Sequence, residues 1–229
     1  MVVVLAAMQQ ELDGIVQAQE HGWRPALQTR VTGVGKVMAA MTTQRIIDEL
    51  APQAVLMVGV AGGLNPRLSI GDVVVGAETL QHDLDVTALG IPRGTVPFTG
   101  YRWLAGDEQL LQAAKHTILP GKNEAGQPVQ LHAGRILTGD QFMSRAAQQQ
   151  HRYLVDELNG DAVDMESAAV AQVCVCNNIP HLVLRVISDT ADGSARVDFW
   201  RFLPRAGQRI QQLTAAVLDA AGNRFMADR

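Results

Sequence analysis

The chain has 229 residues, of which 47% are hydrophobic and 18% charged, and its formal net charge at pH 7 is −4. This length and hydrophobicity allow a large core, and we expect one domain over residues 1–229. The 19 basic residues are scattered singly, which argues against nucleic acid or an anionic membrane as a partner. No apolar stretch approaches the roughly 20 residues that span a bilayer. Met1 leads directly into an apolar run, so we expect a cytoplasmic protein unless a leader has been removed.

The predicted elements alternate between apolar, β-branched runs and amphipathic segments of helix length. This alternation predicts an α/β fold in which helices cover both faces of a central, mostly parallel mixed β-sheet. In chain order we expect strand Val2–Ala7, helix Gln9–Gln19, helix Lys36–Leu50, strand Ala54–Val60, strand Val73–Ala77, helix Glu108–Leu119, strand Leu131–Thr138, helix Arg145–Leu158, helix Met165–Asn177, strand Leu182–Ser188 and helix Arg205–Ala221.

Three acidic residues stand where these elements meet. Glu11 follows the first strand, Glu166 opens a helix and Asp189 follows the last strand. An acid in the first turn of a helix has a purely structural explanation, because free backbone N–H groups favour negative charge there. Ligands of open α/β sheets bind at the carboxyl ends of the strands. We therefore expect the three acids to converge on one site.

Two glycine-rich segments have both a structural and a functional interpretation. TGVGKV (32–37) lacks the third glycine of a dinucleotide loop, where Met38 stands, and the Ser or Thr of a phosphate loop, where Val37 stands. It predicts a tight strand-to-helix turn, and no nucleotide cofactor is expected. In GVAGGL (59–64), Gly62 and Gly63 predict either a simple bend or a backbone that approaches a ligand closely.

Three further features are candidates for metal, base-stacking or disulfide sites: a histidine-containing segment, a loop with an aromatic residue, and the two cysteines. HDLDVTALG (82–90) contains His82 and two aspartates, but no other residues complete a metal set, so we expect a solvated loop or a subunit contact and no metal. Phe142 and Met143 lie in a predicted loop, where an aromatic ring is either a core plug or a surface on which a base stacks. The cysteines at 174 and 176 point to different sides of a helix, which favours two buried free thiols in a reducing compartment.

Eight segments, in order AMQQE, TGVGKV, GVAGGL, GDVVV, HDLDVTALG, TGDQF, DMES and VISDTAD, resemble those of the 5′-methylthioadenosine/S-adenosylhomocysteine nucleosidases. That family lies within the wider purine nucleoside phosphorylase superfamily. The resemblance spans Val2 to Leu218. It implies a nucleoside phosphorylase-like fold and a homodimer. It also implies hydrolysis of an adenosyl nucleoside, with adenine as a product.

The resemblance also implies a role for each acid. Asp189 is expected to protonate adenine at N7, which requires a pKa raised by burial. Glu11 is expected to activate water, and Glu166 to accept both ribose hydroxyls. The remaining residues implied in substrate binding are Gly62 and Gly63 for close backbone approach, Phe142 as a stacking ring, the Met143 backbone at the adenine edge, Met165 under the sugar, and Ser188 as an N-cap that holds Asp189.

Some positions depart from the family pattern. Val60 stands where serine is common, Asp164 replaces a more usual glutamate, and Gln9 and Gln10 replace acids. The loop at 94–103 is divergent; in the family this region crosses a dimer interface to cover the 5′ substituent. Its aromatic residues predict either an apolar lid or a plain subunit contact: Phe98, Tyr101 and Trp103.

Three alternatives remain open at this point. A phosphorylase of the same superfamily needs cationic groups near the nucleophile; Glu11 argues against it and Arg185 in its favour. A related hydrolase acts on another purine nucleoside, such as futalosine. A non-catalytic binder of a nucleoside or a partner has no need of a buried acid beside a base.

Overall fold

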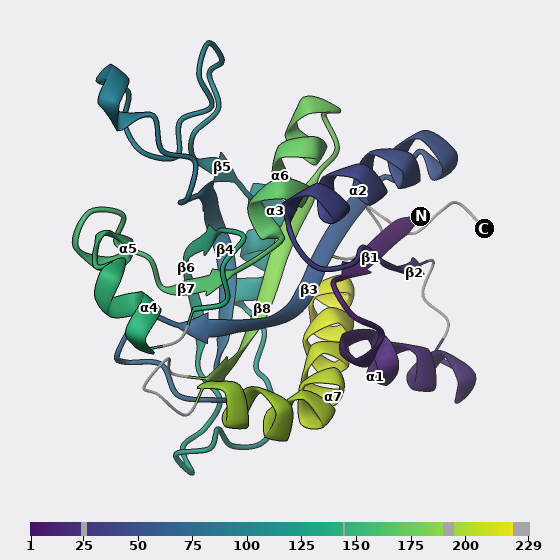
Figure 1. The fold of residues 1–229 in the computed structure, drawn as a ribbon. Helices are drawn as coiled ribbons and strands as arrows, with labels where there is room; N and C mark the ends of the chain where they lie inside the picture. The colour runs from purple at the N-terminus through teal and green to yellow at the C-terminus, as the bar shows by residue number, and fades with distance from the viewer. Residues whose placement is uncertain (24–26, 144, 190–194, 222–229) are drawn as a thin grey trace.

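The structure is a computed structural model that describes residues 1–23, 27–143, 145–189 and 195–221. A mixed sheet runs through the centre and helices pack on both sides of it (Figure 1), which confirms the predicted fold class. The strands are β1 Val2–Ala6, β2 Leu27–Val31, β3 Ala54–Gly63, β4 Val73–Gln81, β5 Leu104–Ala105, β6 Leu131–Thr138, β7 Ala162–Asp164 and β8 His181–Asp189. The helices are α1 Gln9–Glu20, α2 Lys36–Leu50, the 3-10 turn Thr87–Leu89, α3 Glu108–Lys115, α4 Arg145–Gln150, α5 Tyr153–Asp156, α6 Ser167–Cys176 and α7 Ala195–Ala221.

The strand pairing closes part of the sheet on itself. β8 pairs in parallel with β3 and antiparallel with β4. β4 continues to β6, β6 to β7, and β7 returns antiparallel to β3. β1 and β2 extend the sheet beyond the other edge of β3. This arrangement places the ends of β1, β3, β7 and β8 next to one another.

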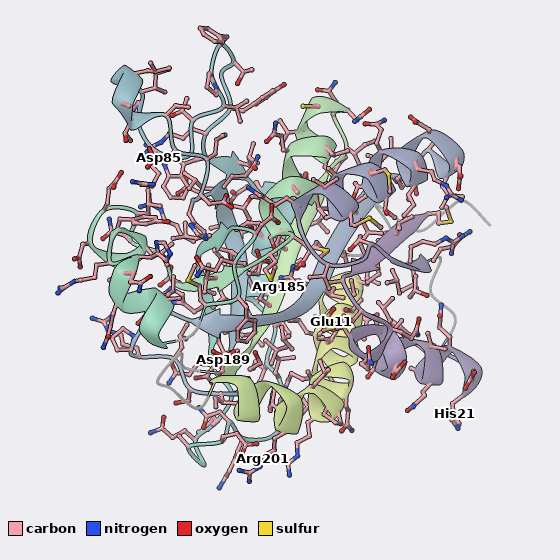
Figure 2. All side chains as sticks on the ribbon, in the orientation of Figure 1. Glu11, His21, Asp85, Arg185, Asp189 and Arg201 are labelled. Carbon is pink, nitrogen blue, oxygen red and sulfur yellow. The ribbon has the colours of Figure 1, made fainter. Side chains whose placement is uncertain are left out.

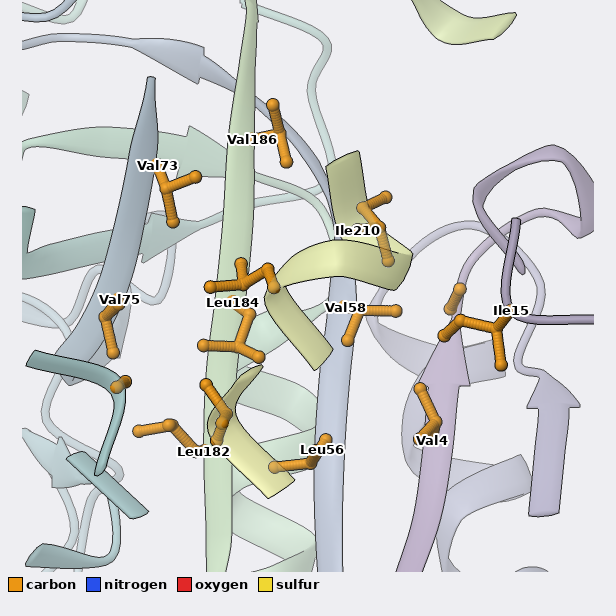
Figure 3. Close-up of a cluster of buried hydrophobic side chains, with 14 of the residues drawn as sticks. Val4, Ile15, Leu56, Val58, Val73, Val75, Leu182, Leu184, Val186 and Ile210 are labelled. Carbon is orange, nitrogen blue, oxygen red and sulfur yellow. The ribbon is translucent and has the colours of Figure 1, made fainter. Parts of the chain in front are cut away.

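Two apolar clusters hold the helices to the sheet. Side chains of α1, α3 and α7 pack on one face, where Ile15 and Ile210 meet strand residues such as Val58 and Leu184 (Figure 3). Side chains of α2 and α6, including Ile46 and Val170, pack on the other face. Each fully buried aliphatic side chain contributes roughly 1.5–3 kcal/mol. On α7, Ile210, Leu213 and Val217 recur at helical spacing and are buried in the first cluster.

Several predicted boundaries were wrong. α7 begins at Ala195 and not at the predicted Arg205, because the helix continues through Pro204. The predicted helix 145–158 is two helices, α4 and α5, and the turn between them brings the Tyr153 ring under Arg93, 4.0 Å from its guanidinium carbon. β2, β5 and β7 were not predicted, because β2 is half-exposed and polar and the other two have two and three residues.

The cysteines differ in environment. Both are free, but only Cys174 is buried while Cys176 is exposed, so the prediction of two buried thiols was wrong for Cys176. The last turn of α6 leaves the Cys176 side chain outside the apolar cluster that covers Cys174. Among the described helices, none has the length and apolar character needed to cross a membrane.

Candidate active site

A cavity of about 350 Å³ opens at the ends of β1, β3, β7 and β8. Its wall contains every predicted site residue except Gly63: Glu11, Gly62, Phe142, Met143, Met165, Glu166, Ser188 and Asp189. Gly63 lies against β8 instead, where an added Cβ would be 3.2 Å from Ile187. Figure 2 shows Glu11, Arg185 and Asp189 in the middle of the molecule. The three acids predicted to share a site, Glu11, Glu166 and Asp189, therefore all lie on the wall of this cavity.

Glu11 is the third residue of α1 and is 1% exposed. One carboxylate oxygen accepts a hydrogen bond from the Met8 N–H at 2.9 Å, as an acid in the first turn of a helix does. The other accepts from the Val60 N–H, also at 2.9 Å. Burial raises the pKa of Glu11, while Arg185 and the backbone donors oppose that rise. Because a raised pKa makes a carboxylate a stronger base, the ionised form of Glu11 is suited to take a proton from water.

Arg185 lies on β8 and is completely buried. Its Nη2 atom is 2.8 Å from Asp164 Oδ2 and 3.7 Å from Glu166 Oε2, and its Nε donates to Ser167 Oγ at 3.1 Å. Gly59 makes room for it, because an added Cβ there would collide with the guanidinium. From the sequence, Arg185 was expected only as a group that could favour a phosphorylase. A single arginine inside the apolar run LVLRVIS was the signal that it is central to the site.

Glu166 lies directly before α6, with a non-helical φ of −135°. Its Oε1 atom accepts from the Gly35 N–H at 2.9 Å. Burial raises the pKa of Glu166 to about 7, and the negative charges of Asp164 and Glu11 add to the rise that Arg185 and Gly35 oppose. Three carboxyl groups thus lie near one guanidinium, and the raised pKa values of Glu166 and Glu11 reflect the excess of buried negative charge.

Asp164 contacts the protein rather than only the cavity. It accepts from Thr138 Oγ1 at 2.6 Å, from the Ser167 hydroxyl and from Arg185. Asp164 therefore pairs with Arg185 directly, and the Ser167 hydroxyl contacts both side chains.

Asp189 is the last residue of β8 and is 2% exposed. The Ser188 hydroxyl lies 3.0 Å from Asp189 Oδ2 and 3.3 Å from the Ala61 carbonyl oxygen. Ser188 belongs to the strand, and its hydroxyl connects Asp189 to the end of β3. The backbone groups that it would cap as an N-cap lie outside the described residues. The raised pKa of Asp189 stays a prediction.

The loop after β6 forms another wall. Phe142 lines the cavity with 47% of its surface exposed, and Met143 is buried in a cluster with Leu80 and Leu137. Met165 completes the wall between Asp164 and Glu166. The wall is mostly apolar, with an aromatic ring that a planar base can stack on.

The predicted lid and the histidine segment lie elsewhere. Phe98 is fully exposed and Trp103 packs under Arg135, so neither lines the cavity of its own chain. The cover of a partner's cavity by the loop at 94–103 stays a prediction. His82 is buried, with Nδ1 3.0 Å from the Tyr153 hydroxyl, so the expected solvated loop was wrong at this residue. Within the described ranges no group of three His, Cys, Asp or Glu residues is placed to hold a metal.

These strand ends and buried acids can be compared with known proteins. A family model described as "Phosphorylase superfamily" matches residues 2–219, more than half of the chain. A curated 5′-methylthioadenosine/S-adenosylhomocysteine nucleosidase from Anoxybacillus flavithermus is 39% identical over 189 residues, which cover 82% of this chain and 78% of that protein.

Solved structures agree with these matches. A 5′-methylthioadenosine/S-adenosylhomocysteine nucleosidase from Helicobacter pylori, crystallised with butyl-thio-DADMe-Immucillin-A, is 30% identical with a TM-score of 0.83 and coverage of 95% of this chain and 97% of that one. The native futalosine hydrolase of Helicobacter pylori strain 26695 has the same identity, TM-score and coverage. The chain therefore belongs to the 5′-methylthioadenosine/S-adenosylhomocysteine nucleosidase family of the phosphorylase superfamily.

Proposed function

We propose that this protein hydrolyses the N-glycosidic bond of 5′-methylthioadenosine, S-adenosylhomocysteine or a similar 5′-substituted adenosine. The products are adenine and the 5′-substituted ribose. The observation that carries the proposal is the meeting of Glu11, Glu166 and Asp189 on the wall of one cavity. Family membership supports the same reaction, because curated relatives have this activity in their names.

Bond cleavage requires a neutral leaving group. Asp189 donates its proton to N7 as the C1′–N9 bond breaks and the bonding electrons move into the purine ring. A positioned proton donor of this kind contributes roughly 10²–10⁴-fold to the rate. Burial of Asp189 favours the protonated acid before the reaction, and the contact with Ser188 holds the carboxyl group in place.

The ribosyl group that remains carries positive charge. Glu166 accepts hydrogen bonds from the two ribose hydroxyls and stabilises that charge, while Glu11 removes a proton from the water whose oxygen bonds to C1′. The Val60 and Met8 N–H groups fix the Glu11 carboxylate in place. Oxygen from water thus ends on the sugar, and the purine leaves with the proton from Asp189.

Water, and not phosphate, is the proposed nucleophile. Arg185, the cation nearest the carboxylates, is already bound by Asp164, Ser167 and the Val58 carbonyl oxygen. The buried Glu11 carboxylate would repel a phosphate ion. A futalosine-type substrate is the second candidate, because a futalosine hydrolase shares the fold at the same TM-score.

A substrate panel tests the proposal. Purified protein is incubated with methylthioadenosine, S-adenosylhomocysteine, 5′-deoxyadenosine, futalosine or inosine, with and without phosphate, and the released base is separated by chromatography. We expect adenine from the adenosyl substrates at the same rate with or without phosphate. Strict phosphate dependence would instead show a phosphorylase, and hypoxanthine from futalosine alone would favour the second candidate.

We further propose that the protein works as a homodimer. Apolar side chains are exposed on the first turns of α2 beside the cavity, with Val37 77% and Met41 58% exposed, and the nearby Val34 also lines the cavity. A second copy of the chain would cover this surface. Light scattering tests the state directly: we expect twice the monomer mass, and a monomer for the wild-type chain at working concentration would contradict the proposal.

For location we propose the cytoplasm. The two free cysteines suit a reducing compartment. Cell fractionation of the untagged protein tests this location. Protein in the membrane or secreted fraction would contradict it.

A further inference from the structure

Three segments that the proposed mechanism leaves unused meet beside the cavity. They are the turn before α2, the segment after β4 and the loop after β6. Lys36 Nζ lies 2.6 Å from Asp83 Oδ1, and the Asp140 N–H donates to Asp83 Oδ2 at 2.9 Å. The Lys36 N–H donates in turn to Asp140 Oδ1 at 2.9 Å. We name this closed set of contacts the Lys36–Asp83–Asp140 triangle.

The triangle is adjacent to the carboxylate proposed to bind ribose. The N–H of Gly35 donates to Glu166, while the next N–H along the chain, that of Lys36, donates to Asp140. Gly35 has a φ of +90°, which favours glycine and turns the two N–H groups toward different acceptors. The start of α2 therefore holds both Glu166 and the loop after β6 through consecutive backbone groups.

The loop on the other side of the triangle carries the stacking ring. Asp140 is followed by Gln141 and Phe142, both of which line the cavity. A shift of Asp140 would move these two residues with it. The separation between the Phe142 ring and Glu166 is thus set through Asp140, Lys36 and Gly35.

The charges in the triangle are only partly screened by solvent. The Lys36 side chain is 18% exposed and that of Asp83 32%. Burial alone would raise the pKa of Asp83, but hydrogen bonds from Lys36 and from the Asp140 backbone outweigh it and hold that pKa below its usual value. The Asp140 side chain is 49% exposed, so the least screened charge of the triangle is that of Lys36. Charge-assisted hydrogen bonds are stronger than those between neutral groups.

We propose that Lys36 and Asp83 are positioning residues that fix the Phe142 loop relative to Glu166 and so increase the affinity for the purine of the substrate. The inference rests on the proposed function, which places the sugar at Glu166, and it adds that the base stacks on Phe142. Neither residue touches the reacting atoms.

The test replaces Lys36 by Met, which keeps the length of the side chain and removes its charge. We expect KM for the nucleoside to rise about tenfold, kcat to change less than about threefold, and free adenine to bind about tenfold more weakly by calorimetry. Lys36→Arg should recover most of the affinity. Arg45→Met is the matched control, because Arg45 is in an exposed ion pair with Glu49 on the same helix, and it should behave like the wild-type protein.

A double-mutant cycle separates positioning from general loss of structure. If the triangle acts through the ring, Lys36→Met should add little to the loss caused by Phe142→Ala, because both remove the same contact. Losses that multiply in the double variant, or a fall in kcat at unchanged KM, would overturn the inference. Asp83→Asn, which preserves the volume of the side chain, gives the same readouts if Lys36→Met does not fold.

The reaction of the wild-type protein distinguishes a failure of the proposed function from a failure of the positioning role. If the wild-type protein releases adenine but Lys36→Met has the same KM and adenine affinity as Arg45→Met, the positioning role of the triangle is contradicted and the proposed function is not. Wild-type protein that neither releases nor binds adenine would contradict the proposed function and this inference with it.

Discussion

The guanidinium of Arg185 and the carboxylate of Asp164 form an ion pair of 2.8 Å whose side chains are 1% and 2% exposed. The pair joins two elements distant in sequence, the end of β7 and the middle of β8. Its removal from water is costly, and mutual attraction and further hydrogen bonds from Thr138 and Ser167 to Asp164 offset that cost.

Replacement of Arg185 by Met should strongly destabilise the fold. The change leaves several buried carboxyl groups without their cation, which costs about 3–5 kcal/mol in the free energy of unfolding. The loss should be smaller at pH 5 than at pH 7.5, because protonation of Glu166 reduces the buried charge. Urea unfolding of Arg152→Met, whose exposed pair with Asp156 contributes about 0.5 kcal/mol or less, is the control. Equal losses in the two variants would contradict the prediction.

Glu166 should make the wild-type protein less stable as the pH rises. Its pKa in the folded protein is about 7 against a usual value of 4.5, so the folded state holds a proton that the unfolded chain has released. This contribution is complete below pH 4.5 and is lost as the pH rises through 7.

The variant Glu166→Gln removes this titration. It should have nearly wild-type stability at pH 4.5 and exceed the wild type by roughly 2–3 kcal/mol at pH 8. Chemical unfolding at both pH values measures the difference. Replacement of the exposed Glu20 by Gln is the control. If the difference in free energy of unfolding between the wild type and Glu166→Gln does not change with pH, the raised pKa of Glu166 is contradicted.

Asp189→Asn should lower kcat by about 10²-fold or more, because the amide cannot donate a proton to the departing purine as an acid does. Binding of a non-hydrolysable nucleoside analogue should weaken much less. Single-turnover rates and calorimetry measure the two effects. Turnover at the wild-type rate would remove Asp189 from the mechanism.

Gly59→Ala should damage stability and activity together. The added methyl group would collide with Arg185 and come within 2.5 Å of Glu11 Oε1, and overpacking of a buried site costs typically about 1–3 kcal/mol. Gly100→Ala is the matched control, since nothing lies within 4 Å of the Cβ it would add. Melting temperature and kcat/KM should fall in Gly59→Ala alone. Wild-type values for Gly59→Ala would show that the Arg185 side chain can move to accommodate the methyl group.

The sequence predicted the elements with strong periodicity and missed those without it. β6 has the predicted bounds because its run LHAGRILT stops at a glycine–aspartate turn, whereas β7 has only three residues and exists because β3 and β6 pair with it. The convergence of Glu11, Glu166 and Asp189 followed from their positions at strand ends. The partners of Arg185 did not, because the lone arginine in the run LVLRVIS indicates a buried charge but not which carboxylates, distant in sequence, pair with it.

The position of β8 between β3 and β4 has a consequence for synthesis on the ribosome. Residues 181–189 are made after most of the chain, yet they fill the centre of the sheet and supply Arg185 and Asp189. Until they emerge, the growing chain has two apolar strands with unpaired edges, which are prone to aggregation. We therefore expect the nascent protein to depend on chaperones until its last quarter has been translated, and to acquire the ability to bind a ligand only then.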